Sequence, residues 1–335
     1  MGLRPPAAAG DRPGGRARRA GTGRRGPRRR QPHRPLRPGG APVTARPARR
    51  TPGTATRHPD RARRHTRYFL DWARAAAPVH LAADVDMSAV EAHRAAAREA
   101  SRRYSAVSYL LFAGARTLAA HPEANAAALG TARPRLARYR AVNAKLALDR
   151  THGGHRTVRT AVLTGADRLD LDAVQEWVVR CRDDDPATLP GAAGLRLLRR
   201  LPPPLGRLAF RAAVRAPDRR AALLGTFAVS SLGHRRVDTF HSYGGTAVTL
   251  CAGRTAPRPV VRDGRIVPAP VMRLGLTFDH RVLDGAAAAE LLDDLVRRLE
   301  EWDAGPSGTP DGRPGRAGDR RAAHTGTGRS LAAGA

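Results

Sequence analysis

The amino-acid sequence predicts an α/β fold: a two-layer sandwich in which helices cover one side of a mixed β-sheet. Between about residues 61 and 302, stretches that alternate with a period of two are interleaved with stretches of helical spacing. The two ends of the chain are poor in large apolar side chains, so they add no further layer. The region between them, roughly 240 residues, is long enough for one sizeable hydrophobic core.

Both ends of the chain have the composition of disordered segments. Residues 1–60 contain 16 arginines against two aspartates, and Arg, Pro, Gly and Ala dominate them. Such a segment buries too little apolar surface to offset the entropy lost on ordering its backbone. Residues 303–335 are similar, though less extreme. We therefore expect a disordered N-terminal segment over 1–60, one domain over 61–302 and a disordered tail over 303–335.

The first half of the domain predicts helices and one pair of strands. Residues 84–91 resemble a capping box, which predicts a helix that begins at Ser88. Leucines at helical spacing before Pro122 predict the next helix, and Gly153-Gly154 predicts the turn of a hairpin. The predicted elements are helices over 88–103 and 108–121, strands over 139–148 and 158–163, a short helix capped by Asp172, and two short helices within 186–222.

The C-terminal third has the clearest pattern. Asp263-Gly264 is a strong hairpin signal. Residues 272–278 alternate with the period of two that one buried face requires. After Asp284 the period changes, because leucines then fall four residues apart and indicate an amphipathic helix. The predicted strands are 226–231, 246–252, 259–261, 265–267 and 272–278, followed by the helix.

The net formal charge of +31 does not by itself predict a nucleic-acid partner. Nearly all basic residues are arginine, Lys145 is the only lysine, and aromatic residues do not interleave the arginines. Arg, Ala, Gly and Pro have GC-rich codons, so the base composition of the gene accounts for much of this bias. The charge of residues 1–60 is therefore the one argument for a nucleic-acid binder.

Cysteine spacing and hydropathy argue against several other classes. Cys181 and Cys251 stand in no CxxC or CxxH spacing, so neither a disulfide framework nor a metal site is predicted. The sequence has no run of about 18 apolar residues, and no apolar stretch follows the arginine-rich start. We therefore expect a cytoplasmic protein without a transmembrane segment.

One histidine, His280, is a candidate general base. His280 falls at the end of a predicted strand, and Asp284-Gly285 falls where a predicted helix begins. An imidazole held by a strand end can project into a cleft as a general base. Asp284 would cap the helix and accept an ion pair, and Gly285 would permit a tight turn. Spacing alone favours a structural or surface histidine.

The letters around His280 resemble a known family. Residues 278–286, FDHRVLDGA, match almost letter for letter the active-site motif of the 2-oxoacid dehydrogenase acyltransferases (dihydrolipoamide acyltransferases). Residues 227–233 resemble the second signature of that family, a strand that ends in a hydroxyl residue. Weaker similarities at Pro78, 84–87 and 121–125 extend the resemblance over about 63–302. It implies a chloramphenicol acetyltransferase-like fold.

The resemblance implies an acyl-transfer mechanism. His280 would take a proton from the thiol of coenzyme A or of a dihydrolipoyl group, and the thiolate would attack a thioester carbonyl. Ser230, with Ser231 as a substitute, would donate a hydrogen bond to the developing oxyanion. Asp284 would be mainly structural, in an ion pair with Arg64 or, failing that, with the residue before it.

The resemblance also implies an assembly. The histidine and the hydroxyl residue of this fold meet across a subunit boundary, which implies a homotrimer or a larger assembly of trimers. Acyl-CoA would be a substrate. Lys145 lies in a predicted strand rather than at the tip of a lipoyl hairpin, so the lipoyl group would come from a separate carrier protein. 2-Oxoacid decarboxylase subunits would be further partners.

Two alternatives of the same fold remain open. One is a trimeric scaffold without chemistry, against which the intact His280, Asp284 and Ser230 argue. The other is a condensation-type O- or N-acyltransferase, whose motif normally has two histidines where residue 279 is aspartate here. Residues 66–70 and 186–222 depart from the family pattern, and this leaves the acyl chain and the acceptor open.

Overall fold

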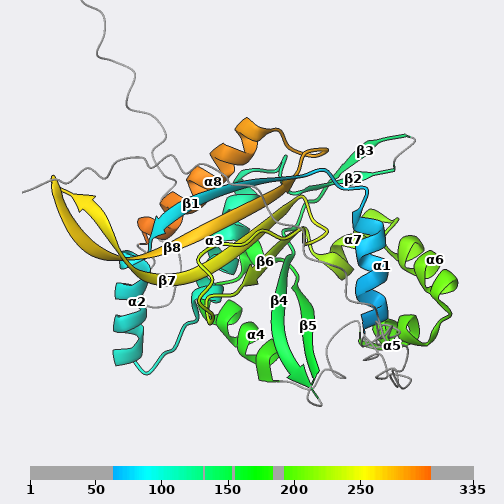
Figure 1. Ribbon diagram of the computed structural model, residues 1–335, viewed down its shortest axis with the longest axis horizontal. Coiled ribbons are helices and arrows are strands. Elements are labelled where there is room, and N and C mark those ends of the chain that lie inside the picture. The colour runs from blue at the N-terminus through cyan, green and yellow to red at the C-terminus, as the bar shows by residue number, and fades with distance from the viewer. Residues whose placement is uncertain (1–62, 131–132, 153–154, 184–191, 303–335) are drawn as a thin grey trace, which may run out of the picture. The chain divides into compact units, whose positions relative to one another are not determined.

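The computed structural model of the chain describes residues 63–130, 133–152, 155–183 and 192–302. The predicted disordered ends and the predicted turn at Gly153-Gly154 lie outside the described residues. The described chain forms a mixed six-stranded sheet and a small two-stranded sheet, with helices packed on one face of the larger one (Figure 1). The predicted fold class is therefore confirmed.

Strand order in the larger sheet is β1-β8-β7-β6-β4-β5. β6 runs parallel to both of its neighbours, β7 and β4, and the other neighbouring pairs are antiparallel. β2 and β3 pair with each other alone. The strands are β1 Pro78–Asp86, β2 Ala126–Leu129, β3 Arg135–Arg138, β4 Ala144–His152, β5 His155–Leu163, β6 Phe227–Ser231, β7 Val248–Arg262 and β8 Arg265–Asp279.

The helices fall into two main groups. α2, α3, α4 and α8 pack on one face of the sheet, since α3 contacts α4, α8 and β6, and α8 contacts β1. α1, α5 and α6 pack against one another, at the right of Figure 1. The helices are α1 Arg64–Ala73, α2 Ser88–Glu99, α3 Ala106–Ala120, α4 Leu171–Asp183, α5 Ala192–Arg200, α6 Pro203–Ala213, α7 Pro217–Leu224 and α8 Gly285–Glu300, with one 3₁₀ turn, η2, over Ala166–Arg168.

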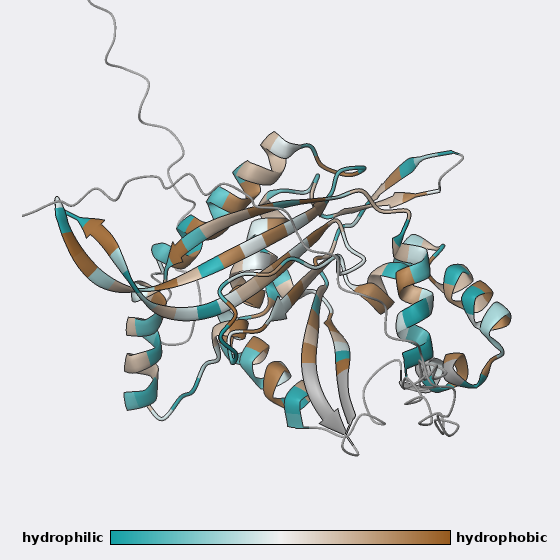
Figure 2. Cartoon of the chain, in the orientation of Figure 1, coloured by the Kyte–Doolittle hydropathy of each residue, from teal (hydrophilic) through white to brown (hydrophobic). Residues whose placement is uncertain are grey.

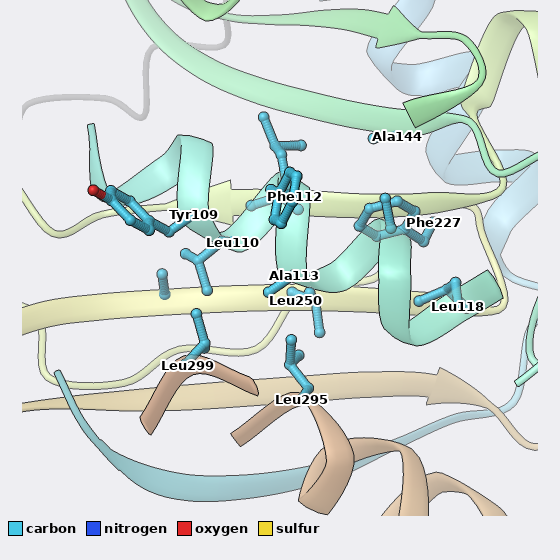
Figure 3. Packing of buried hydrophobic residues seen from close by; sticks show 14 of the residues in the cluster. Tyr109, Leu110, Phe112, Ala113, Leu118, Ala144, Phe227, Leu250, Leu295 and Leu299 are labelled. Carbon is cyan, nitrogen blue, oxygen red and sulfur yellow. The ribbon is translucent and has the colours of Figure 1, made fainter. Parts of the chain in front are cut away.

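The hydrophobic core lies between α3, α8 and one face of the sheet. Leu110 and Leu118 of α3 and Leu295 of α8 meet Phe227 and Leu250 of the strands, all fully buried (Figure 3). Burial of this apolar surface supplies most of the favourable free energy of folding.

The core also fixes which strand residues face away from it. Phe227 and Val229 of β6 belong to the core cluster. Because successive strand residues point to opposite faces, Ala228 and Ser230 lie on the other face. By the same alternation Lys145 of β4, flanked by the core residues Ala144 and Leu146, faces away from the core.

Two helix caps differ from those predicted. Met87 precedes α2 without a side-chain cap, and the carboxylate of Asp86 accepts the Ser88 amide at 3.0 Å instead. At α4, Asp170 accepts the amide of Ala173 at 2.8 Å. Asp172 is not the cap because its carboxylate binds the hydroxyl of Tyr104.

Some predicted elements have other bounds or were not predicted. β7 and β8 each run for 15 residues, where the sequence predicts several short strands. The prolines do not end these strands. Pro259 pairs with Pro268 in a part of the hairpin that β6 and β1 do not reach, where a strand edge tolerates proline. Residues 186–222 contain three helices rather than two, and 184–191 lie outside the described residues. α1 and the β2–β3 pair were not predicted.

The β7–β8 hairpin turns at Asp263-Gly264, as predicted. Both residues have positive φ, 50° and 73°, which is the conformation of a two-residue hairpin turn. The hairpin extends beyond the other strands (Figure 1) and carries hydrophobic residues up to its tip (Figure 2). Val261 and Ile266 are 73% and 77% exposed there.

Candidate active site

His280 lies immediately after β8, as the motif predicts. Its backbone N–H donates to the carbonyl of Ala77 at 2.8 Å, which ties the turn to the residue before β1. Its imidazole is exposed, with the ring centroid 5.6 Å from that of Phe278. Among the described residues the ring has no hydrogen-bond partner. The backbone of the histidine is therefore fixed while its ring stays accessible in the single chain.

Asp279 is the central buried group of the turn, with an exposed fraction of 1%. Its Oδ1 accepts the Arg281 Nε at 2.9 Å and the Arg281 amide at 3.2 Å. Its Oδ2 accepts the other arm of that guanidinium at 2.5 Å and the Tyr243 hydroxyl at 3.2 Å. The Ala77 amide adds a contact at 3.4 Å.

The surroundings of Asp279 keep it ionised. Burial raises the pKa of Asp279, but the Arg281 guanidinium and the backbone amides of Arg281 and Ala77 outweigh burial and hold the pKa below its ordinary value. A carboxylate with this many donors is a stable anchor for the residues next to it.

Asp284 caps α8, as predicted. Its Oδ1 accepts the Ala287 amide at 3.0 Å, and the side chain is otherwise exposed. The ion pair of Asp284 with Arg64, or failing that with Arg63, stays a prediction. Gly285 has no positive φ, and no atom lies within 4 Å of the place of a Cβ. The turn itself therefore does not require glycine at 285.

Ser230 and His280 are far apart within the chain. Ser230 pairs with Cys251 on β7, and Cys251 pairs with Gly275 on β8. His280 lies five residues beyond Gly275, so strand geometry places the two Cα atoms roughly 15–20 Å apart. Ser230 is half-buried, on the face away from the core. One chain does not bring the predicted base and the predicted oxyanion donor together.

Two buried cations lie on the sheet face opposite the core, and sequence reasoning missed their role. Lys145 is 5% exposed, donates to the carbonyl of Gly244 and lies 5.5 Å from the centroid of the Phe69 ring. Arg220 is 4% exposed and donates to the carbonyls of Ala128 at 2.8 Å and Gly245 at 3.2 Å. Among the described residues, no carboxylate forms an ion pair with either. The only signal in the sequence was a lone lysine within a strand.

Burial lowers the pKa of Lys145. Desolvation, and then the charge of Arg220, lower the pKa of the Lys145 ammonium to about 8. Within the described part of the chain, the carbonyl of Gly244 and the Phe69 ring stabilise this ammonium, which is buried next to another cation.

Metal-binding and membrane-spanning features are not found in the described residues. No group of three or more His, Cys, Asp or Glu side chains there could hold a metal ion. No helix there has both the length and the apolar content needed to cross a membrane. Cys181 and Cys251 are both buried.

Comparison with known sequences finds similarity in the C-terminal part of the chain. The family model of the 2-oxoacid dehydrogenases acyltransferase catalytic domain matches residues 216–304. The dihydrolipoyllysine-residue acetyltransferase component of the pyruvate dehydrogenase complex of Bacillus subtilis (strain 168) is 51% identical over 52 residues, 16% of this chain and 12% of that protein. Its counterpart in Staphylococcus aureus (strain Mu50) is 48% identical over 50 residues, 15% and 12%. The chain therefore matches only about an eighth of the length of these curated relatives.

Comparison with solved structures covers most of the described residues. A probable dihydrolipoamide acetyltransferase from Listeria monocytogenes 4b F2365 has a TM-score of 0.54 and 17% identity, and the match covers 74% of this chain and 95% of that one. The dihydrolipoamide acetyltransferase of Azotobacter vinelandii has a TM-score of 0.51 and 24% identity, with 72% and 87% covered. These similarities show the same fold.

The motif around His280 and these matches agree with the resemblance predicted from the sequence. The stretch from α7 to the end of α8 contains β6 with Ser230, the long β7–β8 hairpin and the histidine turn. Residues 216–304 are therefore similar to the catalytic domain of the 2-oxoacid dehydrogenases acyltransferase family.

Proposed function

We propose that the chain is an acyltransferase that moves an acyl group between coenzyme A and a thiol acceptor. His280 is the general base, and Ser230 of a second copy is the oxyanion donor. The observation that supports this most is the accessible His280 ring on the buried Asp279–Arg281 anchor, within the stretch that matches the family model.

The reaction follows from these groups. The imidazole of His280 removes the proton from the S–H of the acceptor thiol, and the thiolate forms a bond to the thioester carbonyl carbon. Negative charge moves onto the carbonyl oxygen, to which Ser230 donates a hydrogen bond. When the tetrahedral intermediate collapses, the bond to the original sulfur breaks and the imidazolium returns the proton to that sulfur.

The separation of Ser230 from His280 supports an active site between chains. Since roughly 15–20 Å divides the two Cα atoms within one chain, a site that uses both groups draws them from two copies. We propose a homotrimer, or an assembly of trimers, in the cytoplasm. One similar structure, at a TM-score of 0.51, is the cubic core of a pyruvate dehydrogenase multienzyme complex. The acceptor is a dihydrolipoyl group on a separate carrier protein.

The test is acetyl transfer from acetyl-CoA to dihydrolipoamide by the purified full chain. We expect His280→Ala to lower kcat by about 10²–10⁴-fold, the contribution of a positioned general base. His121→Ala is a matched control, because His121 pairs with Glu123 and Asp294 at the end of α3 and serves no step.

A second panel separates the alternatives. Equal inactivity of the wild type and His280→Ala over a range of acyl thioesters would favour the non-catalytic scaffold. Transfer to amines or alcohols in preference to thiols, still abolished by His280→Ala, would favour a condensation-type enzyme.

A further inference from the structure

Asp279 and the loop that contacts it connect the histidine turn to the far face of the sheet. The Tyr243 hydroxyl donates to Asp279 Oδ2 at 3.2 Å, across 36 residues of sequence. Burial, and then the charge of Asp279, raise the pKa of Tyr243 to about 12, so the hydroxyl keeps its proton at neutral pH. The carboxylate that receives this hydrogen bond is adjacent to the proposed base.

The backbone after Tyr243 is pressed closely against the sheet. A Cβ on Gly244 would come within 2.6 Å of the Ala228 Cβ, and Gly245 has a φ of 86°. The amide of Gly244 donates to Thr249 Oγ1 at 2.9 Å. The loop thus follows one path that a side chain at either glycine would block.

Two buried cations bind the backbone carbonyls of the loop that follows Tyr243. Lys145 donates to the carbonyl of Gly244, and Arg220 donates to that of Gly245 at 3.2 Å. Their charged ends lie over aromatic rings of α1, with Lys145 Nζ 5.5 Å from the Phe69 centroid and Arg220 Cζ 4.9 Å from the Trp72 centroid. Buried cations without a carboxylate partner among the described residues are costly, which suggests a role other than stability.

We propose that Tyr243 is a positioning residue for His280: the buried cations Lys145 and Arg220 fix its loop, and its hydroxyl fixes the Asp279 carboxylate on which the histidine turn is built. The proposal rests on the function proposed above, in which His280 is the base. Neither Tyr243 nor the cations touch the reacting atoms. They act through Asp279, whose contacts with Arg281 and Ala77 set the backbone on both sides of His280.

The test uses Tyr243→Phe, which removes one hydroxyl and keeps the ring. Hydrogen–deuterium exchange of the His280 and Arg281 amides reports the order of the turn without reference to activity. We expect exchange there to accelerate about tenfold, and kcat to fall by a similar factor with KM unchanged, because one hydrogen bond to a charged acceptor is lost.

Tyr68→Phe is the matched control. The Tyr68 hydroxyl is also buried but has no hydrogen-bond partner among the described residues. The same change there should alter neither the exchange of the turn nor kcat. Unchanged exchange in Tyr243→Phe, or equal changes in both variants, would overturn the proposal.

Lys145→Met is the second variant and tests the cation step. It keeps the length of the side chain and removes the donor to Gly244, so we expect faster exchange at both 244–245 and 280–281. Acceleration at 244–245 alone would refute the link from Lys145 to the turn. If the wild type proves inactive, the proposed function fails, while the exchange experiment still decides whether Tyr243 orders the turn.

Discussion

At the scale of single residues, Lys145 shows a conflict between stability and local order. Its pKa of about 8 in the folded chain compares with 10.5 for an ordinary lysine. Below pH 8 both states of the chain bind the proton, and the folded state bears the full cost of a buried cation, about 3 kcal/mol. Between pH 8 and 10.5 the unfolded chain holds more of the proton than the folded chain, so stability rises with pH.

Lys145→Met should therefore stabilise the protein at pH 7. Removal of the buried charge gains about 3 kcal/mol, and the unpaired Gly244 carbonyl costs about 1 kcal/mol, which leaves a net gain of about 2 kcal/mol. Chemical denaturation of the wild type and of Lys145→Met at pH 7 and at pH 10 measures this difference in the free energy of unfolding. The advantage should shrink at the higher pH, and a difference independent of pH would contradict the protonation argument.

Ser230 carries the proposed oxyanion contact. Ser230→Ala should lower kcat by ~10²–10³-fold, the usual effect of losing one such donor. Ser231 is the natural comparison, because its Oγ accepts the amide of Gly233 at 3.3 Å within its own loop. Steady-state kinetics of Ser231→Ala should show a much smaller loss. A larger effect at 231 than at 230 would reassign the donor.

At the scale of elements, the packing of α6 on α1 depends on one glycine. A Cβ on Gly206 would lie 2.5 Å from the Tyr68 ring, and Tyr68 is 3% exposed. Gly206→Ala should thus force the two helices apart and destabilise the protein by about 1–3 kcal/mol, the range for overpacking a core.

Gly194 of α5 gives the opposite expectation. It is exposed, and no atom lies within 4 Å of the place of its Cβ. Gly194→Ala should stabilise the protein by about 0.5–1 kcal/mol, because alanine favours a helix and glycine does not. Thermal unfolding of the two variants compares them directly, and destabilisation of both would mean that α5 is also packed at this position.

The sequence predicts local elements well and long-range contacts poorly. The change of period from two to helical spacing placed β8, the turn and α8, and with them His280. The partners of that turn were not predictable, because Tyr243–Asp279 spans 36 residues and Lys145–Gly244 spans 99. No periodicity encodes which loop covers which strand.

At the scale of the whole molecule, the separation of Ser230 from His280 makes the assembly testable. Chains with His280→Ala and chains with Ser230→Ala should each be nearly inactive alone. When the two are co-expressed, an interface can combine an intact histidine with an intact serine. With random mixing in a cyclic trimer we expect about a quarter of wild-type activity.

The control for this experiment keeps both changes in one chain. A double variant co-expressed with either single variant contains no interface with both intact groups, so its activity should stay near background. If the two single variants do not recover activity although native mass spectrometry shows that their chains have mixed, the arrangement between subunits is refuted.

The burial of Lys145 has a consequence for the chemistry of the surface. Thioesters acylate free amines without any enzyme, and a protein that concentrates them risks modifying itself. Here the only ε-amine of the chain is covered by the Phe69 ring and the Gly244 carbonyl, and the exposed cations are guanidinium groups, which resist acylation. The folded domain thus presents no reactive amine to the very compounds that it is proposed to handle.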